Sequence, residues 1–276
     1  MGYLKSTVSV FLVLILSMTC TGKNINQNVP DNIENKNSVI ERFEFPEGLL
    51  NALEKSNLPQ GIVLNILSGI ESGSSFLDDL SAITQDDPYL WILVDKEHSL
   101  PSDYEPSDLL VLKNGTYRIN RNDLKLRSIA EAALEEMAAE ARNDGITLLA
   151  SSAYRAFMYQ AELYDRNVKI LGQKQADRES ARPGHSQHQL GLVIDFGSIT
   201  DDFALTAEGI WLSENASRFG WSLSYPQGYE DVTGYQWECW HYRYTGTLLA
   251  DFIDNYFEGI QQYALRFIHE WKLITE

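Results

Sequence analysis

The sequence is short of basic residues, and this shortage disfavours two classes of partner. Its 276 residues include 22 lysines and arginines against 39 aspartates and glutamates, for a formal net charge of −17 at pH 7. A nucleic-acid binder needs clustered basic side chains to neutralise phosphates, so that class is disfavoured. An anionic membrane surface is an equally poor partner for such a chain.

The apolar stretch that could suggest a membrane segment is short. Residues 8–16 are mostly apolar, follow Lys5 and precede small and polar residues, which is the order of an export signal. The stretch is too short for a comfortable membrane span, which takes roughly 20 residues. A buried N-terminal core helix, or myristoylation at Gly2, is the alternative, but the strong apolar character favours export.

Cysteine is limited to Cys20 and Cys239. The segment LSMTC at residues 16–20 resembles a bacterial lipoprotein signal, in which the cysteine becomes the lipidated first residue, although Ser17 and Thr19 depart from the usual pattern. A lipidated Cys20 would exclude an intramolecular disulfide even in an oxidising compartment. We therefore expect an exported cell-envelope lipoprotein that faces the periplasm or the cell exterior, with simple secretion or an uncleaved anchor as alternatives.

Polarity and helix signals divide the chain into four segments. We expect an export or lipoprotein signal at 1–20, a flexible tether at 21–38, a helical N-terminal extension at 39–88 and the main domain at 89–276. The tether is rich in asparagine and other polar residues. Within the extension we expect one or two short helices, broken near Pro59 and Gly61.

The main domain mixes expected helices and strands around a small sheet, which is an α+β pattern. Apolar runs predict strands at 89–96, 146–154, 190–196 and 240–246. Two prolines make 99–112 an extended surface segment. Helices are predicted at 122–145, 157–172, 206–220 and, as one long helix, 248–271. The first of these is expected to be capped by Asn122 or Asp123 and to end at Gly145.

The segment HSQHQLGLVIDF at 185–196 places Asp195 inside an apolar run. A buried carboxylate without a partner is costly, so something positive should meet it. Asp195 lies on a predicted strand, and His188 precedes Gly191, where the chain can turn toward the strand. Imidazole nitrogen and carboxylate oxygen are both good zinc ligands, and a divalent cation would remove the cost of burying Asp195.

The segment WECWH at 237–241 supplies the rest of a catalytic zinc site. A catalytic zinc usually has three protein ligands, and His241 is the third candidate. Glu238 is of the right type to act as a general base, while Trp237 and Trp240 would keep the site partly dry. The first motif alone is a weak signal, and the second makes the pair considerably more specific.

Four segments, in family order, resemble the VanY-like D-alanyl-D-alanine carboxypeptidases, which are zinc peptidases of the LAS group. SQHQLGLVID is similar to the motif SxHxxGxAxD, WECWH to ExxH, SSAYRAFMYQ to SxYRsxxxQ, and ILVDKEHSLPSDYEPSDLLVL to the opening segment of the family. The resemblance covers residues 90–250. It implies a LAS/hedgehog-like fold, in which a small antiparallel central sheet is flanked by helices. Val193 is a mild departure, because the family often has alanine there.

The resemblance assigns roles by position. It implies one Zn²⁺ per chain, held by His188, Asp195 and His241, with Glu238 as the catalytic base. Arg155 and Ser186 match substrate-binding positions, although Arg155 could instead pair with a neighbour such as Glu162. Two further substrate-side candidates are Gln160, which should face the site from a helix, and His185, which either contacts substrate, orients a ligand or is a solvated loop residue.

The implied function is zinc-dependent removal of the C-terminal D-alanine from peptidoglycan stem peptides. An L,D-carboxypeptidase or a peptidoglycan endopeptidase of the same fold uses the same chemistry and stays open. A non-catalytic zinc-bearing envelope protein is a further alternative, but Glu238 argues against it. A purely structural zinc would usually have four protein ligands, and only three convincing candidates occur, because Cys239 is a poor one.

Overall fold

The computed structural model describes residues 36–40, 43–46 and 48–275. The expected signal at 1–20, with Cys20, and most of the expected tether lie outside this part, so the structure does not test them. Within it, no helix is both long enough and apolar enough to cross a membrane.

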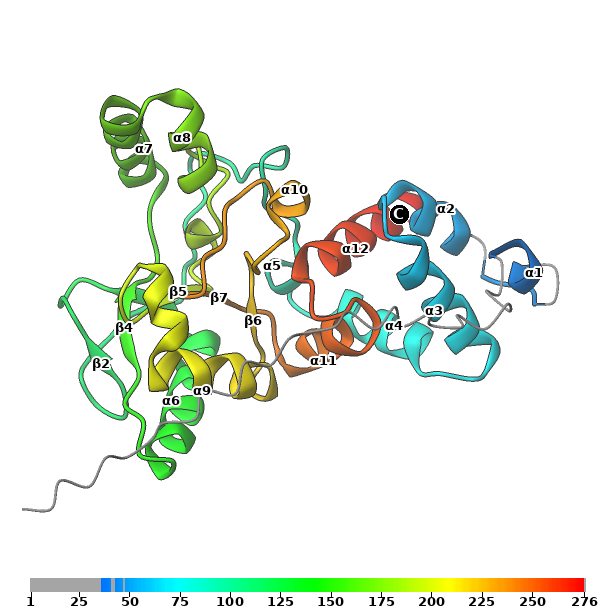
Figure 1. Cartoon of the computed structure of the whole chain (residues 1–276), viewed down its shortest axis with the longest axis horizontal. Helices are drawn as coiled ribbons and strands as arrows, with labels where there is room; N and C mark the ends of the chain where they lie inside the picture. Colours follow the sequence, from blue (N-terminus) through cyan, green and yellow to red (C-terminus); the bar gives the residue numbers. More distant parts are fainter. Residues whose placement is uncertain (1–35, 41–42, 47, 276) are drawn as a thin grey trace, which may run out of the picture. The chain divides into compact units, whose positions relative to one another are not determined.

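A five-stranded sheet forms the centre of the main domain, with the strand order β2-β4-β5-β7-β6 (Figure 1). The strands are β2 Arg118–Ile119, β4 Leu149–Ser152, β5 Val193–Phe196, β7 His241–Tyr244 and β6 Trp221–Leu223. All neighbours pair antiparallel except β2 and β4 at one edge, which pair parallel. The expected α+β fold with a small, mainly antiparallel central sheet is therefore confirmed.

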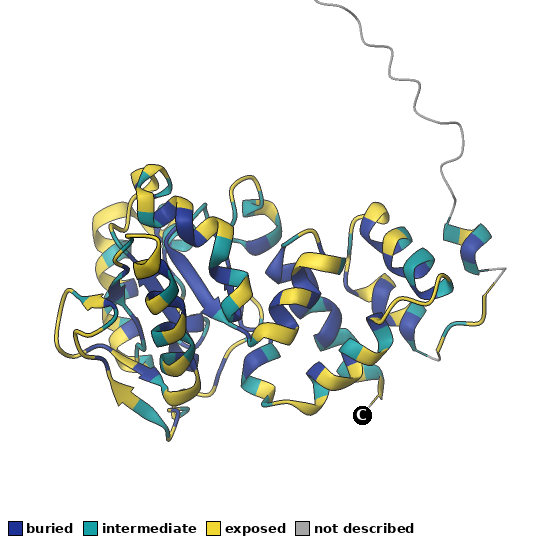
Figure 2. Ribbon diagram, turned by 90° about the horizontal axis from the view of Figure 1, so that it is seen from below, coloured by how far each residue is buried: buried dark blue, intermediate teal, exposed yellow. Residues whose placement is uncertain are grey.

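Strand β5 occupies the middle of the sheet, as its sequence predicts. All four of its residues are buried, because a central strand is covered on both faces (Figure 2). Asp195 on β5 pairs directly with His241 on β7. Ser152 on β4 pairs with Asp195 from the other side. The ladder thus brings chemically active side chains from distant parts of the chain to one point.

The sheet is flanked by helices, two of which carry parts of the pocket described below. They are α6 Ser128–Asn143, α7 Phe157–Leu171, α8 Gln173–Glu179, α9 Ala207–Asn215 and the short α10 Glu230–Thr233. Three 3-10 helices, η1 Gln187–Leu190, η2 Asp201–Leu205 and η3 Ala216–Phe219, connect them to the strands. Helix α7 ends before Gly172, and the segment α9–η3 ends at Gly220, both as expected.

The prediction of a helix capped at Asn122 or Asp123 was wrong at its start. Helix α6 begins at Ser128, with Arg127 at its N-cap. The preceding residues, Lys125–Arg127, form β3 and pair antiparallel with β1, Leu109–Val111. Backbone pairing within this two-stranded sheet therefore overrides the local capping signal.

The strand predicted at 89–96 was also wrong. Its first half is the short helix α5, Pro88–Trp91, which begins after Asp87 because that side chain accepts a hydrogen bond from the backbone N–H of Tyr89. Proline suits the first position of a helix, where its missing N–H is not needed. The carbonyls of Tyr89, Leu90 and Ile92 accept hydrogen bonds from buried Arg243 rather than from a neighbouring strand.

The long C-terminal helix is in fact two helices, α11 Thr247–Tyr256 and α12 Gln261–Thr275. Glu258 and Gly259 between them have φ values of 56° and 72°, a left-handed conformation that cannot continue a right-handed helix. The break also lets Phe257 become fully buried. Tertiary packing thus overrides a continuous helical pattern.

Helices α11 and α12 pack with the N-terminal helices in a second apolar cluster, separate from the cluster around the sheet (Figure 1). The N-terminal helices are α1 Lys36–Ile40, α2 Leu49–Lys55, α3 Gln60–Glu71 and α4 Phe76–Gln85. The break expected near Pro59 falls between α2 and α3, whereas Gly61 lies inside the first turn of α3. We call α2, α3, α4, α11 and α12 together the helical region, and the sheet with its flanking helices the sheet region.

Candidate metal centre and active site

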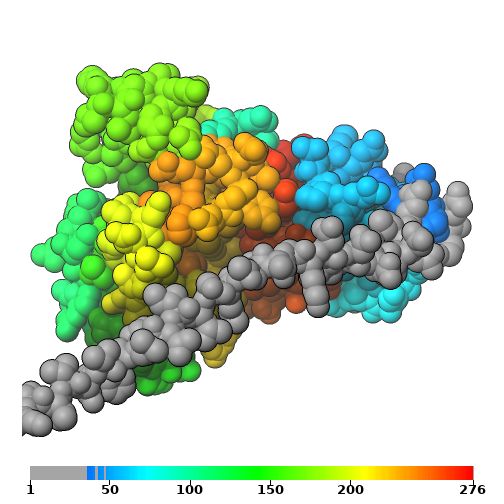
Figure 3. All heavy atoms as spheres, in the orientation of Figure 1, coloured from blue at the N-terminus to red at the C-terminus, as the bar shows by residue number. Residues whose placement is uncertain are grey.

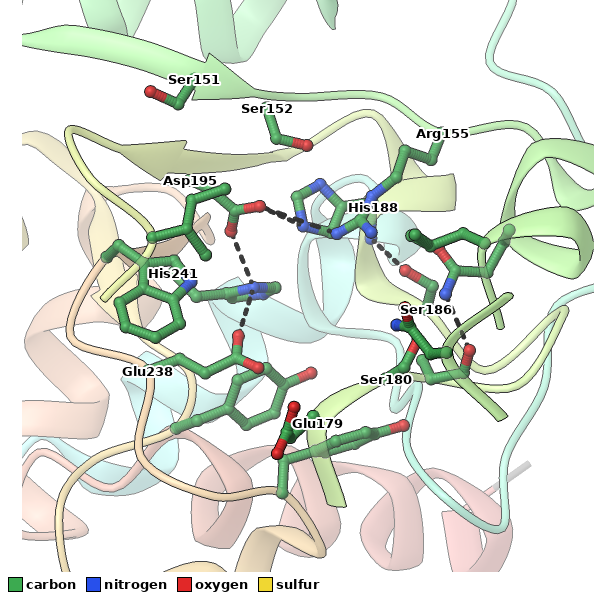
Figure 4. A pocket seen from close by; sticks show the side chains of 18 of the residues that line it. Ser151, Ser152, Arg155, Glu179, Ser180, Ser186, His188, Asp195, Glu238 and His241 are labelled. Atoms are coloured by element: carbon green, nitrogen blue, oxygen red, sulfur yellow. Dashed lines mark hydrogen bonds and ion pairs between the residues drawn. The ribbon is translucent and has the colours of Figure 1, made fainter. Parts of the chain in front are cut away.

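Three predicted metal ligands meet at the end of the central strands. His188 lies on η1, Asp195 on β5 and His241 at the start of β7. One ligand atom from each lies within 4.8 Å of the others, and among the described residues this is the group that could hold a metal ion (Figure 4). Gly191 joins η1 to β5 at φ 68°, where a Cβ would lie 2.9 Å from Leu109, so the turn that delivers His188 favours glycine.

The three side chains are buried and face one another across short distances. Asp195 Oδ2 lies 3.2 Å from His188 Nε2, and Asp195 Oδ1 lies 3.2 Å from His241 Nδ1. The two imidazole rings stand edge to face, with their centroids 4.9 Å apart. Figure 4 shows the carboxylate lying between the two rings.

The protonation of His188 shows that this cluster suits a cation. His188 Nδ1 lies 2.7 Å from the carbonyl oxygen of Ala153, which can only accept, so Nδ1 carries the hydrogen. The Nε2 lone pair therefore points toward the acidic oxygens of Asp195. Neither His188 Nε2 nor Asp195 Oδ1 has a hydrogen-bond partner in the described part of the chain. Acceptors that converge without a proton are the donor set that Zn²⁺ prefers.

Electrostatics keep His188 and Asp195 in the forms that bind metal, whereas the carboxylates beside His241 favour its protonated form, from which zinc would displace the proton. Burial, together with the Arg155 guanidinium, lowers the pKa of His188 to about 4, so its imidazole is neutral. Burial alone would raise the pKa of Asp195, but the two neighbouring imidazoles outweigh it and hold that pKa well below its ordinary value. For His241, burial is outweighed by Asp195 and Glu238, and its pKa is raised.

Glu238 lies beside the cluster without belonging to it. Its Oε2 is 3.3 Å from His241 Nδ1, and its backbone N–H donates to the carbonyl of Tyr225 at 3.0 Å. Burial raises the pKa of its carboxyl group above the ordinary value. A buried carboxylate with a raised pKa is a better proton acceptor than an exposed one, which suits the general base predicted from the sequence.

Arg155 faces the cluster from the segment between β4 and α7. Its Nη2 lies 3.7 Å from Asp195 Oδ2, so its ion-pair partner is a predicted metal ligand. Its Nε has no hydrogen-bond partner in the described part of the chain, although it is buried. Its backbone N–H donates to the carbonyl of His188 at 3.3 Å, which ties the arginine to η1. The guanidinium therefore keeps donors available beside the metal ligands.

Of the other predicted substrate contacts, two lie at the site and one does not. Ser186 lines the pocket and caps η1, because its Oγ accepts from the backbone N–H of His188 at 3.3 Å. Gln160 lines it from α7 and donates to the carbonyl of Ala181 at 2.7 Å. His185 instead lies 2.7 Å, through Nδ1, from the carbonyl of Asp95 and lines a neighbouring cavity. The structure thus gives no support to His185 as a substrate contact.

The cluster opens into a cavity of about 400 Å³, a size suited to a small peptide end. Its wall is built from α7, the end of α8 and residues 225–240, and these segments lie next to one another in the space-filling view (Figure 3). Tyr235 and Trp240 line it, but Trp237, also expected to shield the site, packs against the sheet cluster.

Several lining residues were not singled out by the sequence. They are Arg121, Ser151, Ser152, Tyr159, Glu179, Ser180, Tyr225 and Gln236. Ser151 and Ser152 belong to the segment SSAYRAFMYQ, so their position next to Arg155 was a usable signal. Arg121 and Tyr225 come from segments without any motif, and only the fold brings them to the pocket.

Comparison with known proteins agrees with this site. The VanY family model, described as D-alanyl-D-alanine carboxypeptidase, matches residues 123–247. A D-alanyl-D-alanine carboxypeptidase of Enterococcus faecalis (strain ATCC 700802 / V583) is 32% identical over 227 residues, which cover 77% of this chain and 80% of the relative.

Two solved structures share the fold as well as the sequence similarity. The LdcB LD-carboxypeptidase is 34% identical, with a TM-score of 0.57 over 62% of this chain and 86% of LdcB. A vancomycin resistance D,D-pentapeptidase VanY in complex with Zn(II) is 31% identical, with a TM-score of 0.52 over 62% of this chain and 96% of that one. With its pocket, its ligand cluster and these relatives, the chain belongs to the VanY family of D-alanyl-D-alanine carboxypeptidases.

Proposed function

We propose that this chain is a zinc-dependent D-alanyl-D-alanine carboxypeptidase that removes the C-terminal D-alanine from peptidoglycan stem peptides. The observation that carries the proposal is the open cluster of His188, Asp195 and His241 with Glu238 beside it. Three ligands leave a coordination position for water or substrate, whereas a structural zinc is usually closed by a fourth ligand. The cluster found in the described residues has three.

The side chains around the cluster divide the chemistry between them. A zinc ion held there would supply Lewis acidity, which acidifies water and polarises a peptide carbonyl. Glu238 accepts the proton of the attacking water, and it can return that proton to the leaving amine. The raised pKa of Glu238 makes both transfers easier, because the group lies closer to the working pH.

Arg155 is suited to recognise the C-terminal end of the substrate peptide. A carboxypeptidase must hold the terminal carboxylate of its substrate, and a guanidinium binds a carboxylate through two parallel hydrogen bonds. The unpartnered Nε of Arg155 lies in the pocket wall, beside the metal ligands. In a chain with a net charge of −17, a local arginine also offsets the repulsion of an anionic substrate.

An L,D-carboxypeptidase is a second candidate, favoured by one observation. LdcB is an LD-carboxypeptidase, and its TM-score of 0.57 exceeds the 0.52 of the zinc-bound VanY structure. The two activities differ in the residue that precedes the bond, which is D-alanine in a pentapeptide and an L-configured centre in a tetrapeptide. The family model and the Enterococcus relative favour the D,D activity.

Product analysis separates these candidates. The purified protein, with its zinc content measured, is given a stem pentapeptide ending in D-Ala-D-Ala or a tetrapeptide ending in one D-Ala, and products are identified by mass spectrometry. We expect about one zinc per chain and loss of one D-alanine from the pentapeptide. Cleavage of the tetrapeptide alone would establish the L,D activity instead. A protein without zinc or turnover would contradict both.

The place of action is part of the proposal. An envelope lipoprotein anchored through Cys20 would hold this domain beside peptidoglycan. Support comes from the export-like order of residues 1–20 and from the peptide substrates of the relatives. The test is the fractionation of expressing bacteria: the protein should be found with membranes, and Cys20→Ser should release it or leave an unprocessed precursor. An unchanged distribution together with unchanged processing of the chain would contradict lipidation at Cys20.

A further inference from the structure

The second ring nitrogen of His241 faces an amide. His241 uses Nδ1 toward Asp195, and its Nε2 lies 3.3 Å from Oε1 of Gln187. Gln187 is buried on η1, next to His188. Gln187, which precedes the predicted ligand His188 in the sequence, thus contacts the other predicted ligand, His241.

Gln187 is itself held by two partners. Its Oε1 accepts from Ser224 Oγ at 2.8 Å, and its Nε2 donates to Oε1 of Gln261 at 3.3 Å. Gln261 is the first residue of α12 and is also buried. Its own Nε2 donates to the backbone carbonyl of Ser222 at 3.2 Å. The contacts run without interruption from the start of α12 to the metal centre.

This chain of contacts has one consistent direction. The Ser222 carbonyl can only accept, so Gln261 must present its Nε2 to it and its Oε1 to Gln187. Gln187 must then turn its Nε2 to Gln261 and its Oε1 to His241. An amide oxygen accepts, and therefore the hydrogen of His241 belongs on Nε2. The Nδ1 lone pair is left to point at the cluster.

We propose that Gln187 is a positioning residue that fixes His241 in the Nε2–H tautomer, with Gln261 holding Gln187 in the required orientation. The inference rests on the proposed zinc site. An outer partner of a ligating histidine fixes its tautomer and orientation, and losing such a partner weakens metal binding by about 10- to 100-fold. Through Gln261, the helical region takes part in building the metal centre.

Zinc affinity of the full chain tests this role. Gln187→Leu removes the acceptor for His241, and zinc affinity, measured by competition with a chelating dye, should fall about 10- to 100-fold. Gln187→Glu keeps an acceptor for His241 but loses the donor to Gln261, so it should recover part of that loss. Gln261→Leu acts one contact further out and should have a smaller effect in the same direction.

Gln189→Leu is the matched control. Gln189 is a buried glutamine on the same short helix, but it donates to the carbonyls of Pro101 and Tyr104 and contacts no predicted ligand. Its replacement should leave zinc affinity within about twofold of the parent. This change is much smaller than the loss of about 10- to 100-fold expected for Gln187→Leu. An equal loss in Gln187→Leu and Gln189→Leu, or no loss in either, would overturn the proposal.

The tautomer can be observed without metal and without variants that may not fold. In the metal-free protein with ¹⁵N-labelled histidine, Nε2 of the His241 ring should carry a hydrogen, whereas Nδ1, which faces Asp195 and Glu238, can carry a second one until zinc replaces it. A bare Nε2 would overturn the inference even if zinc binds. Absence of zinc binding in the parent protein, with the tautomer as stated, would contradict the proposed function and leave the role of Gln187 intact.

Discussion

The sheet region and the helical region bury different kinds of side chain. Fully buried side chains in the helical region are mainly aliphatic and aromatic, and Phe76 packs there against Phe252, Phe257 and Phe267. The sheet region also has a large apolar cluster, but it buries a carboxylate, two imidazoles and the guanidinium of Arg243 on two strands and the adjoining helix η1.

The difference separates stability from function. Burying apolar side chains favours folding, whereas burying polar groups without full hydrogen bonding costs free energy. Atoms without a hydrogen-bond partner include His188 Nε2, Asp195 Oδ1 and Arg155 Nε, all at the candidate site. The family model covers residues 123–247, which takes in the predicted ligands but not α2, α3, α4 or α12. We infer that, apart from the contact of Gln261 with Gln187, the helical region serves stability, whereas the convergence of polar side chains in the sheet region serves catalysis.

The largest expected effect is on turnover, from Glu238→Gln in the sheet region. The amide cannot accept the proton of the attacking water, so kcat should fall by about 10²- to 10⁴-fold. Zinc should stay bound, because Glu238 is not one of the three clustered ligands. The measurement is kcat on the pentapeptide together with zinc content and thermal stability.

Glu179→Gln is the matched control for that variant. Glu179 also lines the pocket, but its carboxylate accepts a hydrogen bond from Gln175 within α8. Its neutralisation should change kcat far less than the change at Glu238, and by less than about tenfold. Full activity of Glu238→Gln would remove Glu238 from the mechanism and weaken the contrast between the two regions.

The next effect is on stability, from Phe76→Ala in the helical region. Phe76 is fully buried among aromatic rings, so its truncation should lower the free energy of unfolding by about 3–5 kcal/mol, as measured by denaturant titration. Leu273→Ala, at a side chain that is 67% exposed, should cost less than about 0.5 kcal/mol. Zinc affinity of folded Phe76→Ala should match the parent; a large loss would break the proposed separation of roles.

Local signals made much of the site predictable. Strand β5 follows from an apolar run in which Val193, Ile194 and Phe196 are of strand type, and Gly191 marks the turn that brings His188 back toward Asp195. His241 pairs with Asp195 in the sheet. The order of the motifs predicted that the two residues lie close together, but it did not predict the register of the strands. Residue type, strand alternation and turn chemistry are local properties, which is why a single sequence can reveal them.

What could not be predicted depends on packing between distant segments. The helix start at Ser128 is decided by the pairing of β3 with β1, and the break at Glu258 by the burial of Phe257. Gln187 and Gln261 lie 74 residues apart, and no periodicity in either segment indicates their contact. His185 lies in the same segment as His188 and its role was left open, and in the structure its ring turns to the backbone of Asp95.

A smaller effect is expected for Arg155→Lys, which tests the role of the sheet region in substrate binding. Lysine keeps the charge but loses the planar pair of donors, so kcat/KM should fall by about 10- to 100-fold, which corresponds to losing one charge-assisted hydrogen bond of about 1.5–3 kcal/mol. Arg121→Lys is the control, because Arg121 lines the same pocket but pairs with exposed Asp123. Equal losses in both variants would mean that Arg155 acts through general charge rather than through its geometry.

The smallest effect lies at Asp95, where the two regions meet. Its Oδ1 accepts from the backbone N–H groups of Glu97 and His98 and lies 2.8 Å from His98 Nδ1, and its Oδ2 accepts from Gln262 of α12. Asp95→Asn replaces one acceptor oxygen by a donor. It should lower the free energy of unfolding at pH 7 by about 1–3 kcal/mol.

The cost of Asp95→Asn should depend on pH. Burial alone would raise the pKa of Asp95, but its hydrogen bonds from Glu97 and His98 outweigh burial and hold that pKa below the ordinary value. A carboxyl group with a lowered pKa stabilises the fold above the pKa of the unfolded chain, near 3.9, and this contribution is lost as the pH falls through the folded-state value. Urea unfolding of the parent and of Asp95→Asn is therefore compared at pH 7 and at about pH 3. The difference between their free energies of unfolding should be smaller in acid. If the difference in free energy of unfolding is the same at both pH values, Asp95 connects the two regions through packing rather than through its charge.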